Sequence, residues 1–293
     1  MDKRRTHAAA LKLRIIGFVG LAALLLLQAC STLTLGYNRA ATLGYWWLDG
    51  QLDLNDTQSQ QLRADLDTLH RWHRREALPQ YAELLQRWEQ LTAQDITPAQ
   101  ACEQFEAART LLVPIATRSA QPLAQLGQSL SPAQLDHLRR QQAKDNQRFK
   151  QDFVDAPQNG LDKRVSRLID RLEMFYGRLD ASQRRLVRDH LARGSFDGAV
   201  ALAERERRQN DVLQTVTALQ AAPAQGAALV QAVVQRSLES PSSTYRNASR
   251  QWQREGCALI AALHNSSSPA QRANVAARLR DHMGDFTLLA QQN

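Results

Sequence analysis

The five residues Leu130-Ser131-Pro132-Ala133-Gln134 mark the start of a helix. Ser131 is a favoured N-cap residue, Pro132 suits the first helical position, and Gln134 can reach back from the third position to the cap backbone. The same order recurs as Leu54-Asn55-Asp56-Thr57-Gln58, Ile96-Thr97-Pro98-Ala99-Gln100, Leu179-Asp180-Ala181-Ser182-Gln183 and, more weakly, Ser267-Ser268-Pro269-Ala270-Gln271. The sequence therefore predicts five helices that begin at capping boxes.

The composition of the chain favours an all-α protein. Only 13 glycines and 9 prolines interrupt 293 residues, and good helix formers dominate the remainder. Apolar residues recur every three or four positions, and the clearest stripe contains Val165, Leu168, Ile169, Leu172, Phe175 and Leu179. We expect an irregular bundle of about eight to ten amphipathic helices that follows a cleaved signal peptide.

Helical spacing assigns most of the chain to particular helices. Two runs, 62–69 and 81–91, lie on either side of Pro79, which either kinks one helix or starts a new one. Later amphipathic stretches cover residues 98–112, 132–153, 161–179, 181–193, 197–219, 227–238, 242–263 and 269–289. The turn-rich segment Asp155–Gly160 is the best candidate for a boundary between them.

These features divide the chain into four parts. Residues 1–29 are expected to be a signal peptide and residues 30–50 a lipidated N-terminal segment. Residues 51–156 and 160–293 form an N-terminal and a C-terminal helical part, which are either two domains or one.

The N-terminal segment has the charge pattern of a secretion signal. An apolar run, 15–27, is short for a membrane span, and five basic residues precede it: Lys3, Arg4, Arg5, Lys12 and Arg14. The run ends at Leu27-Gln28-Ala29-Cys30, which resembles the lipobox of bacterial lipoproteins. That resemblance implies cleavage before Cys30 and lipid attachment to its thiol. The alternatives are a plain signal peptide that contains a cysteine and an uncleaved anchor helix.

Removal of the signal peptide changes the expected location and charge. Ser31 would follow the lipidated cysteine, and similarity to other Gram-negative lipoproteins then implies the inner leaflet of the outer membrane, facing the periplasm. Loss of five basic residues and one acidic residue lowers the net charge from +8 to about +4. We therefore expect no nucleic-acid partner, and we interpret Arg205, Arg207 and Arg208 as a solvated helix face.

Aromatic residues gather shortly after the expected anchor, at Tyr37, Tyr45, Trp46 and Trp47. This segment either lies at the membrane surface, where Trp and Tyr are enriched, or forms a helix that docks into the bundle. The acidic residues that follow, such as Asp49 and Asp53, favour docking because they would face anionic headgroups in the first case.

Motifs that carry chemistry are scarce. The sequence contains no phosphate-binding glycine loop, no His-Glu-x-x-His and no Gly-x-Ser-x-Gly, so we expect no catalytic residues and no cofactor. His70 and His73 are spaced to share one helix face, but Asp67 is the only acid nearby. We interpret both histidines as structural or surface residues, and a metal site as the alternative.

Cys102 and Cys257 are the cysteines that remain after lipidation of Cys30. In an oxidising compartment they form either a disulfide or two buried thiols that act as small apolar side chains.

Two family resemblances follow from these motifs. Leu-Thr-x-x-Gln at helix starts is similar to the signature of the Spy and CpxP family, whose members are helical periplasmic chaperones and stress sensors. The motifs Tyr37-Asn38, Trp46-Trp47 and Trp72-His73-Arg74, together with Cys30-Ser31, look like those of a family of uncharacterised proteobacterial lipoproteins. The second resemblance implies a location and a fold, but no activity.

Three function hypotheses result. The first is a non-enzymatic structural or interaction role, in which the anchored bundle binds another envelope protein. The second is a Spy-like, ATP-independent chaperone that holds unfolded clients on a surface rimmed by Arg167, Arg171 and Arg178, beside the apolar stripe. The third, a metal-binding or enzymatic role centred on His70 and His73, has the least support.

Overall fold

A computed structural model describes residues 32–292, and these residues confirm the all-α class. They form helices and contain no β-strand. The chain divides into two compact units, Met1–Ala40 and Ala41–Asn293. In the first unit the described helix is α2 (Thr32–Asn38). The second unit therefore contains both of the helical parts expected from the sequence, 51–156 and 160–293.

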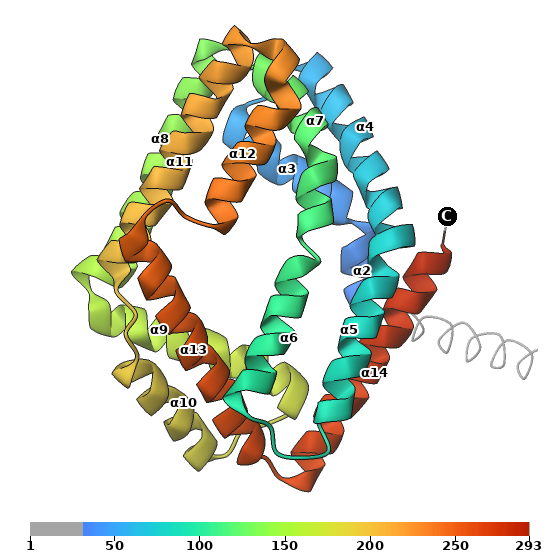
Figure 1. Cartoon of the computed structure of the whole chain (residues 1–293), viewed down its shortest axis with the longest axis vertical. Coiled ribbons are helices and arrows are strands. Elements are labelled where there is room, and N and C mark those ends of the chain that lie inside the picture. Colours follow the sequence, from blue (N-terminus) through green and yellow to red (C-terminus); the bar gives the residue numbers. More distant parts are fainter. Residues whose placement is uncertain (1–31, 293) are drawn as a thin grey trace, which may run out of the picture. The chain divides into compact units, whose positions relative to one another are not determined.

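The helices of the second unit follow one another with short connections (Figure 1). Their bounds are α3 (Ala40–Leu52), α4 (Asp56–Trp72), α5 (Leu78–Leu91), α6 (Pro98–Thr110), α7 (Val113–Ser129), α8 (Pro132–Lys150), α9 (Pro157–Tyr176), α10 (Ala181–Arg193), α11 (Gly198–Ala221), α12 (Gly226–Leu238), α13 (Ser243–Asn265) and α14 (Pro269–Gln291). Neighbours in space are often distant in sequence, because α5 packs on α14, α7 on α12, α6 on α13 and α8 on α11.

All five predicted capping boxes are present. Each cap side chain accepts a hydrogen bond from the backbone N–H of the glutamine three residues later, and each glutamine side chain accepts one from the cap backbone; the caps are Asn55, Thr97, Ser131, Asp180 and Ser268. Leu130 and Leu179, which directly precede two of the caps, are buried, as a hydrophobic staple onto the first turn requires. The signature therefore sets where α4, α6, α8, α10 and α14 begin.

Four of these glutamines form two reciprocal pairs. Gln58 and Gln134 donate to each other's Oε1 atoms at 3.2 and 2.7 Å, and Gln183 and Gln271 do the same at 2.8 and 2.9 Å. Each Nε2 also donates to a backbone carbonyl two residues before its partner's cap; the acceptors are Ser129, Asp53, Ser266 and Arg178. The start of α4 is thereby joined to that of α8, and the start of α10 to that of α14.

Pro79 starts a new helix without ending the old one. A π-helical turn, η1 (His73–Ala77), links α4 directly to α5, and Pro79 lies in the first turn of α5. Proline lacks the N–H that would bond to the carbonyl of Arg75, so a wider turn at this place removes the conflict. Figure 1 shows α4 and α5 continuing into one another.

The segment Asp155–Gly160 is a tight junction between helices. A second π-helical turn, η2 (Gln151–Asp155), extends α8, and only Ala156 separates it from α9. Gly160 lies within α9, where a Cβ atom would stand 2.6 Å from the carbonyl oxygen of Asp152. The absence of a side chain at Gly160 therefore permits close packing against η2, whereas the sequence predicted a turn at this residue.

Two helices differ from the expectations. α7 was not predicted, because Pro114 and Pro122 break its pattern; Pro114 occupies the first turn, where proline is tolerated, and Pro122 lies inside the helix. α3 contains the aromatic segment, with Tyr45 and Leu52 buried. The Tyr45 hydroxyl donates to Ser59 Oγ at 3.1 Å.

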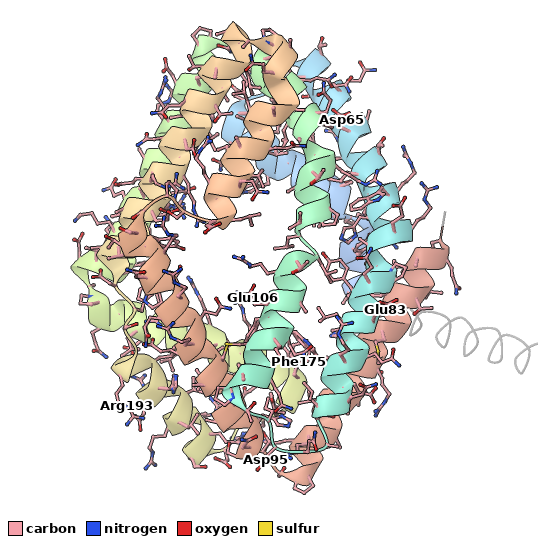
Figure 2. The ribbon with its side chains drawn as sticks, in the orientation of Figure 1. Asp65, Glu83, Asp95, Glu106, Phe175 and Arg193 are labelled. Atoms are coloured by element: carbon pink, nitrogen blue, oxygen red, sulfur yellow. A yellow bond between two sulfur atoms is a disulfide. The ribbon has the colours of Figure 1, made fainter. Side chains whose placement is uncertain are left out.

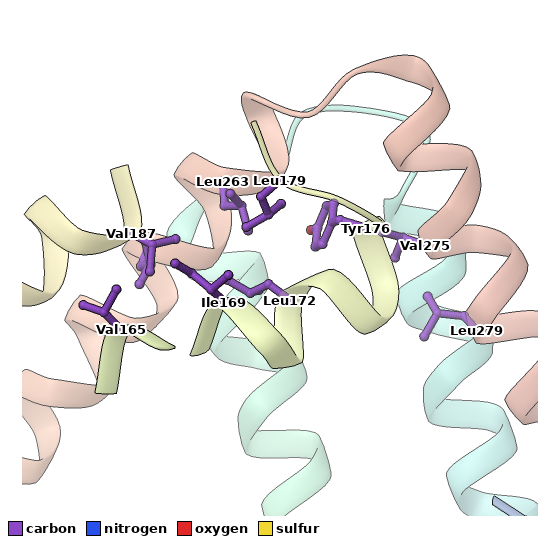
Figure 3. Close-up of a cluster of buried hydrophobic side chains, with 10 residues drawn as sticks. Val165, Ile169, Leu172, Tyr176, Leu179, Val187, Leu263, Val275 and Leu279 are labelled. Carbon is purple, nitrogen blue, oxygen red and sulfur yellow. The ribbon is translucent and has the colours of Figure 1, made fainter. Parts of the chain in front are cut away.

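Three clusters of buried side chains lie within the second unit. The largest joins α9, α10, α13 and α14 around the predicted stripe (Figure 3), and its buried members are Val165, Ile169, Leu172, Tyr176, Leu179, Val187, Leu259, Leu263, Val275 and Leu279. A second cluster surrounds Leu52, Leu130 and Val216, and a third surrounds Ala124 and Leu219. Each of the two clusters with the most members includes a leucine that directly precedes a cap, Leu179 in the first and Leu130 in the second.

Gln183→Glu tests the reciprocal pairs, because glutamate can complete a capping box but has no N–H to donate. Gln183 is 1% exposed, so we expect the free energy of unfolding at neutral pH to fall by about 3 kcal/mol in urea denaturation. Gln100→Glu is the matched control, since Gln100 caps α6 without a glutamine partner, and its cost should stay below about 0.5 kcal/mol. Equal losses in both variants would contradict the role of the pairs.

Candidate functional site

The expected lipidation site, Cys30, lies outside the described residues, as does the signal peptide. Within residues 32–292, no helix combines the length and apolar character that a membrane span requires. Further along, α3 exposes Leu43, Trp46 and Trp47, of which Trp47 is 66% exposed. The aromatic segment thus divides its side chains between the bundle and the surface.

His70 and His73 lie at the end of α4 and in η1, and the two are close enough to interact. Burial, followed by the neighbouring His70, lowers the pKa of His73. The His73 ring packs against Tyr81 with 5.4 Å between centroids. No cluster of three or more His, Cys, Asp or Glu residues suited to a metal ion occurs in the part of the chain that the structure describes.

The tryptophan next to His73 packs into the bundle. Trp72 is buried and donates from Nε1 to Glu76 Oε2 at 2.8 Å. Glu76 also pairs with Arg118 of α7 at 3.3 Å. Arg118 also lies over the Trp72 ring. This contact was missed because α7 was not predicted.

Cys102 and Cys257 form a disulfide between α6 and α13, with 5.3 Å between the Cα atoms. The bridge closes a loop of 155 residues, which corresponds to about 5 kcal/mol of stabilisation in the chain-entropy model. Of the two alternatives that the sequence left open, the structure contains the bridge.

Of the arginines expected to rim an interaction surface, Arg167 and Arg171 lie on α9 and Arg178 lies in the turn that follows it. Arg167, Arg171 and Arg178 are all exposed. Only Arg171 lines a cavity, whereas the other two lie outside every cavity described below. These three side chains therefore do not converge on a single site.

The interpretation of Arg205, Arg207 and Arg208 as a solvated helix face holds only in part, because Arg207 and Arg208 pair with a buried carboxylate. Glu204, which is 4% exposed, accepts hydrogen bonds from Arg207, Arg208 and Ser240. Against the desolvation that burial imposes, these bonds hold the pKa of Glu204 below its ordinary value. α11 thus carries a buried ion network that charge counting along the sequence cannot distinguish from a surface.

That network continues to α12. Asp211 accepts hydrogen bonds from Arg236 at 2.6 Å and from Arg207 at 3.3 Å. The bonds from Arg236 hold the pKa of Asp211 below its ordinary value. Two carboxylates and three guanidinium groups therefore hold α11 against the end of α12 and the loop after it.

A large groove opens beside this network; we call it the α11 groove. It has a volume of about 900 Å³, and α3, α7, α8, α11, α12 and the first turn of α13 line it. Most lining side chains are apolar, and Trp47, Leu123 and Val212 among them are exposed. Arg205, Arg208, Asp145 and Glu204 supply charge along one part of the wall.

A second, smaller cavity lies against the largest hydrophobic cluster; we call it the α9 pocket. It has a volume of about 360 Å³ and is lined from α5, α6, α9, α13 and α14. Figure 2 labels Phe175, one of its aromatic side chains. Its wall is almost entirely apolar, and its few polar residues are Thr92, Gln104, Arg171, Tyr176 and His264.

Tyr176, His264 and the backbone carbonyl of Gln94 form a hydrogen-bond chain at the wall of the α9 pocket. Tyr176 Oη lies 3.0 Å from His264 Nδ1, and His264 Nε2 lies 3.1 Å from the carbonyl oxygen of Gln94. A carbonyl can only accept, so Nε2 carries the proton and Nδ1 accepts from the tyrosine. Both ring nitrogens are therefore occupied.

The environment favours the uncharged form of both side chains. Burial raises the pKa of Tyr176 to about 12, although Arg272 opposes the shift. Burial also lowers the pKa of His264; Arg272 acts in the same direction, while the Gln94 carbonyl and Asp95 oppose it. Because both nitrogens of the neutral imidazole are engaged in hydrogen bonds, His264 has no free lone pair with which to act as a general base. The pair Tyr176–His264 is instead arranged to hold the fold.

Residues 50–246 match the family of unknown function DUF6279. The chain belongs to this family. The DUF6279 match runs from the end of α3 to the start of α13, so it includes nearly all of the helices that line the α11 groove. Neither curated proteins nor solved structures yield a match to the chain.

Acidification should destabilise the protein through His264. The unfolded chain binds a proton below the ordinary histidine pKa while the folded protein resists it, so the free energy of unfolding should fall as pH drops from about 7 to about 5. His73 should add to this slope because its pKa is also lowered. In His264→Gln, a neutral amide can bond to both Tyr176 and Gln94, and urea denaturation should give a smaller slope. An unchanged slope would contradict the neutral form of His264.

Proposed function

We propose that this chain is a lipoprotein anchored through Cys30 at the inner leaflet of the outer membrane and that its helical body binds another envelope protein without catalysing a reaction. The observation that supports a binding role is the α11 groove, which has a volume of about 900 Å³ and a mostly apolar wall. Exposed apolar side chains at a concave surface favour an apolar segment of a partner.

The anchoring role rests on the sequence of the N-terminal segment. The basic residues, the short apolar run and Leu27-Gln28-Ala29-Cys30 support export and lipid attachment. The disulfide between Cys102 and Cys257 fits an oxidising compartment.

A Spy-like holdase is the second candidate, and the wall of the groove favours it. Arg205 and Arg208 lie beside apolar side chains, a combination that can hold unfolded segments of varied sequence. The two candidates share one surface and differ in the partner, which is one folded envelope protein in the first case and many unfolded clients in the second.

Replacement of Cys30 tests the anchor. Cells grown with labelled palmitate should label the unchanged chain and retain it in the outer-membrane fraction, whereas Cys30→Ala should carry no label and leave that fraction. The double variant Cys102→Ala, Cys257→Ala is the control and should stay labelled. Label on Cys30→Ala would contradict lipid attachment at this residue.

A charge in the α11 groove tests the binding role. With a photo-crosslinking residue at Trp47 in the anchored protein, we expect a crosslink to one envelope protein that Val212→Asp reduces at least about tenfold. Met174→Asp is the matched control, because Met174 is also an exposed apolar residue on a helix but lies outside the groove. It should leave the crosslink unchanged.

The same variants separate the two candidates. If the purified compact unit, residues 41–293, suppresses aggregation of a denatured model protein near an equimolar ratio without ATP, and Val212→Asp removes this effect, the holdase replaces the first proposal. If neither a crosslink nor suppression of aggregation is observed, the groove binds no protein and both candidates are wrong.

A further inference from the structure

The α9 pocket is apolar along almost its whole wall. Its lining includes Trp88, Phe105, Leu168, Phe175 and Ile260, contributed by four different helices. A volume of about 360 Å³ is at the lower end of the range for small-molecule sites, near ~300 Å³. The pocket is therefore large enough for one small apolar ligand.

Two buried polar atoms of this wall have no hydrogen-bond partner. Trp88 Nε1 is a donor and Gln104 Oε1 an acceptor, and both residues line the pocket. A buried donor or acceptor without a partner costs free energy, and native proteins contain few of them. Because both belong to one cavity, a polar group within that cavity would satisfy them.

Arg171 is the only lining residue with a fixed charge. Its side chain is exposed, and within residues 32–292 it makes no ion pair with any carboxylate, although Arg184 and Arg188 of α10 pair with carboxylates of α9. His264 and Tyr176 are uncharged, as derived above. The charge at the pocket is therefore positive, and a guanidinium recognises a carboxylate through paired N–H bonds.

We propose that the α9 pocket binds a single-chain aliphatic carboxylate, with the chain against the apolar wall and the carboxylate on Arg171. The head group accepts hydrogen bonds from Arg171 and Trp88, and a water or hydroxyl that accompanies it donates to Gln104. A flexible chain suits a cavity formed by side chains of five helices. This site is separate from the α11 groove and does not rest on the function proposed above.

Laurate is the probe, and the compact unit of residues 41–293, which contains all three hydrophobic clusters, is the protein. Calorimetry should give one saturable site, and dodecanol should bind at least about tenfold more weakly because it lacks the charge. Arg171→Gln should lower laurate affinity by a similar factor and leave dodecanol unchanged. Arg167→Gln, one helical turn away and outside the pocket, should bind laurate normally.

A second measurement places the head group beside Trp88. Laurate brominated on the carbon next to its carboxylate should quench tryptophan fluorescence at saturating ligand, and Trp88→Phe should remove that quenching, whereas Trp252→Phe should keep it. No saturable laurate binding, equal losses in both arginine variants, or quenching that persists in Trp88→Phe would each overturn the proposal.

Discussion

The reciprocal contact between two capping glutamines is the constraint on which the arrangement of helices depends. A primary amide has two N–H donors and one oxygen with two acceptor sites. In each pair, the oxygen accepts from its own cap backbone and from the partner amide, while the nitrogen donates to the partner amide and to a partner carbonyl. Every site of both amides is used, so two helix starts are fixed together without a buried charge.

This constraint explains why glutamine stands at the third position in four of the five copies of the signature. A capping box alone accepts glutamate as well as glutamine, but a carboxylate cannot donate to a second helix start. The remaining copy, at Gln100, has no glutamine partner. There the side-chain amide of Asn265 joins the helix start to another helix. Asn265 donates to the carbonyl of Ile96 and accepts from its N–H, so the start of α6 is held to the end of α13.

The local part of the fold could be predicted from sequence, and the non-local part could not. Caps and apolar stripes act within a few residues, which is why the start of α8, both ends of α10 and the burial of Leu179 follow from the pattern. The pairing of Gln183 with Gln271 depends on 88 residues of intervening chain. The same limit explains the misinterpreted arginines of α11, since Arg207 looks solvated until Ser240 and Arg236 are placed beside it.

The candidate sites follow from the same distinction. Arg171 was selected from sequence because it flanks an apolar stripe, but Arg167 and Arg178 meet that criterion equally, and only the placement of α5, α6 and α14 separates them. Trp88 and Gln104 gave no signal, because an unpartnered atom is defined by its surroundings. Among the helices that line the α9 pocket, α14 is held at its start by the pair Gln183–Gln271, and α6 is joined to α13 by Asn265 and by the disulfide Cys102–Cys257. Binding capacity in this fold therefore arises between helices whose ends are already held, so that a ligand can fill the space without bearing the cost of organising it.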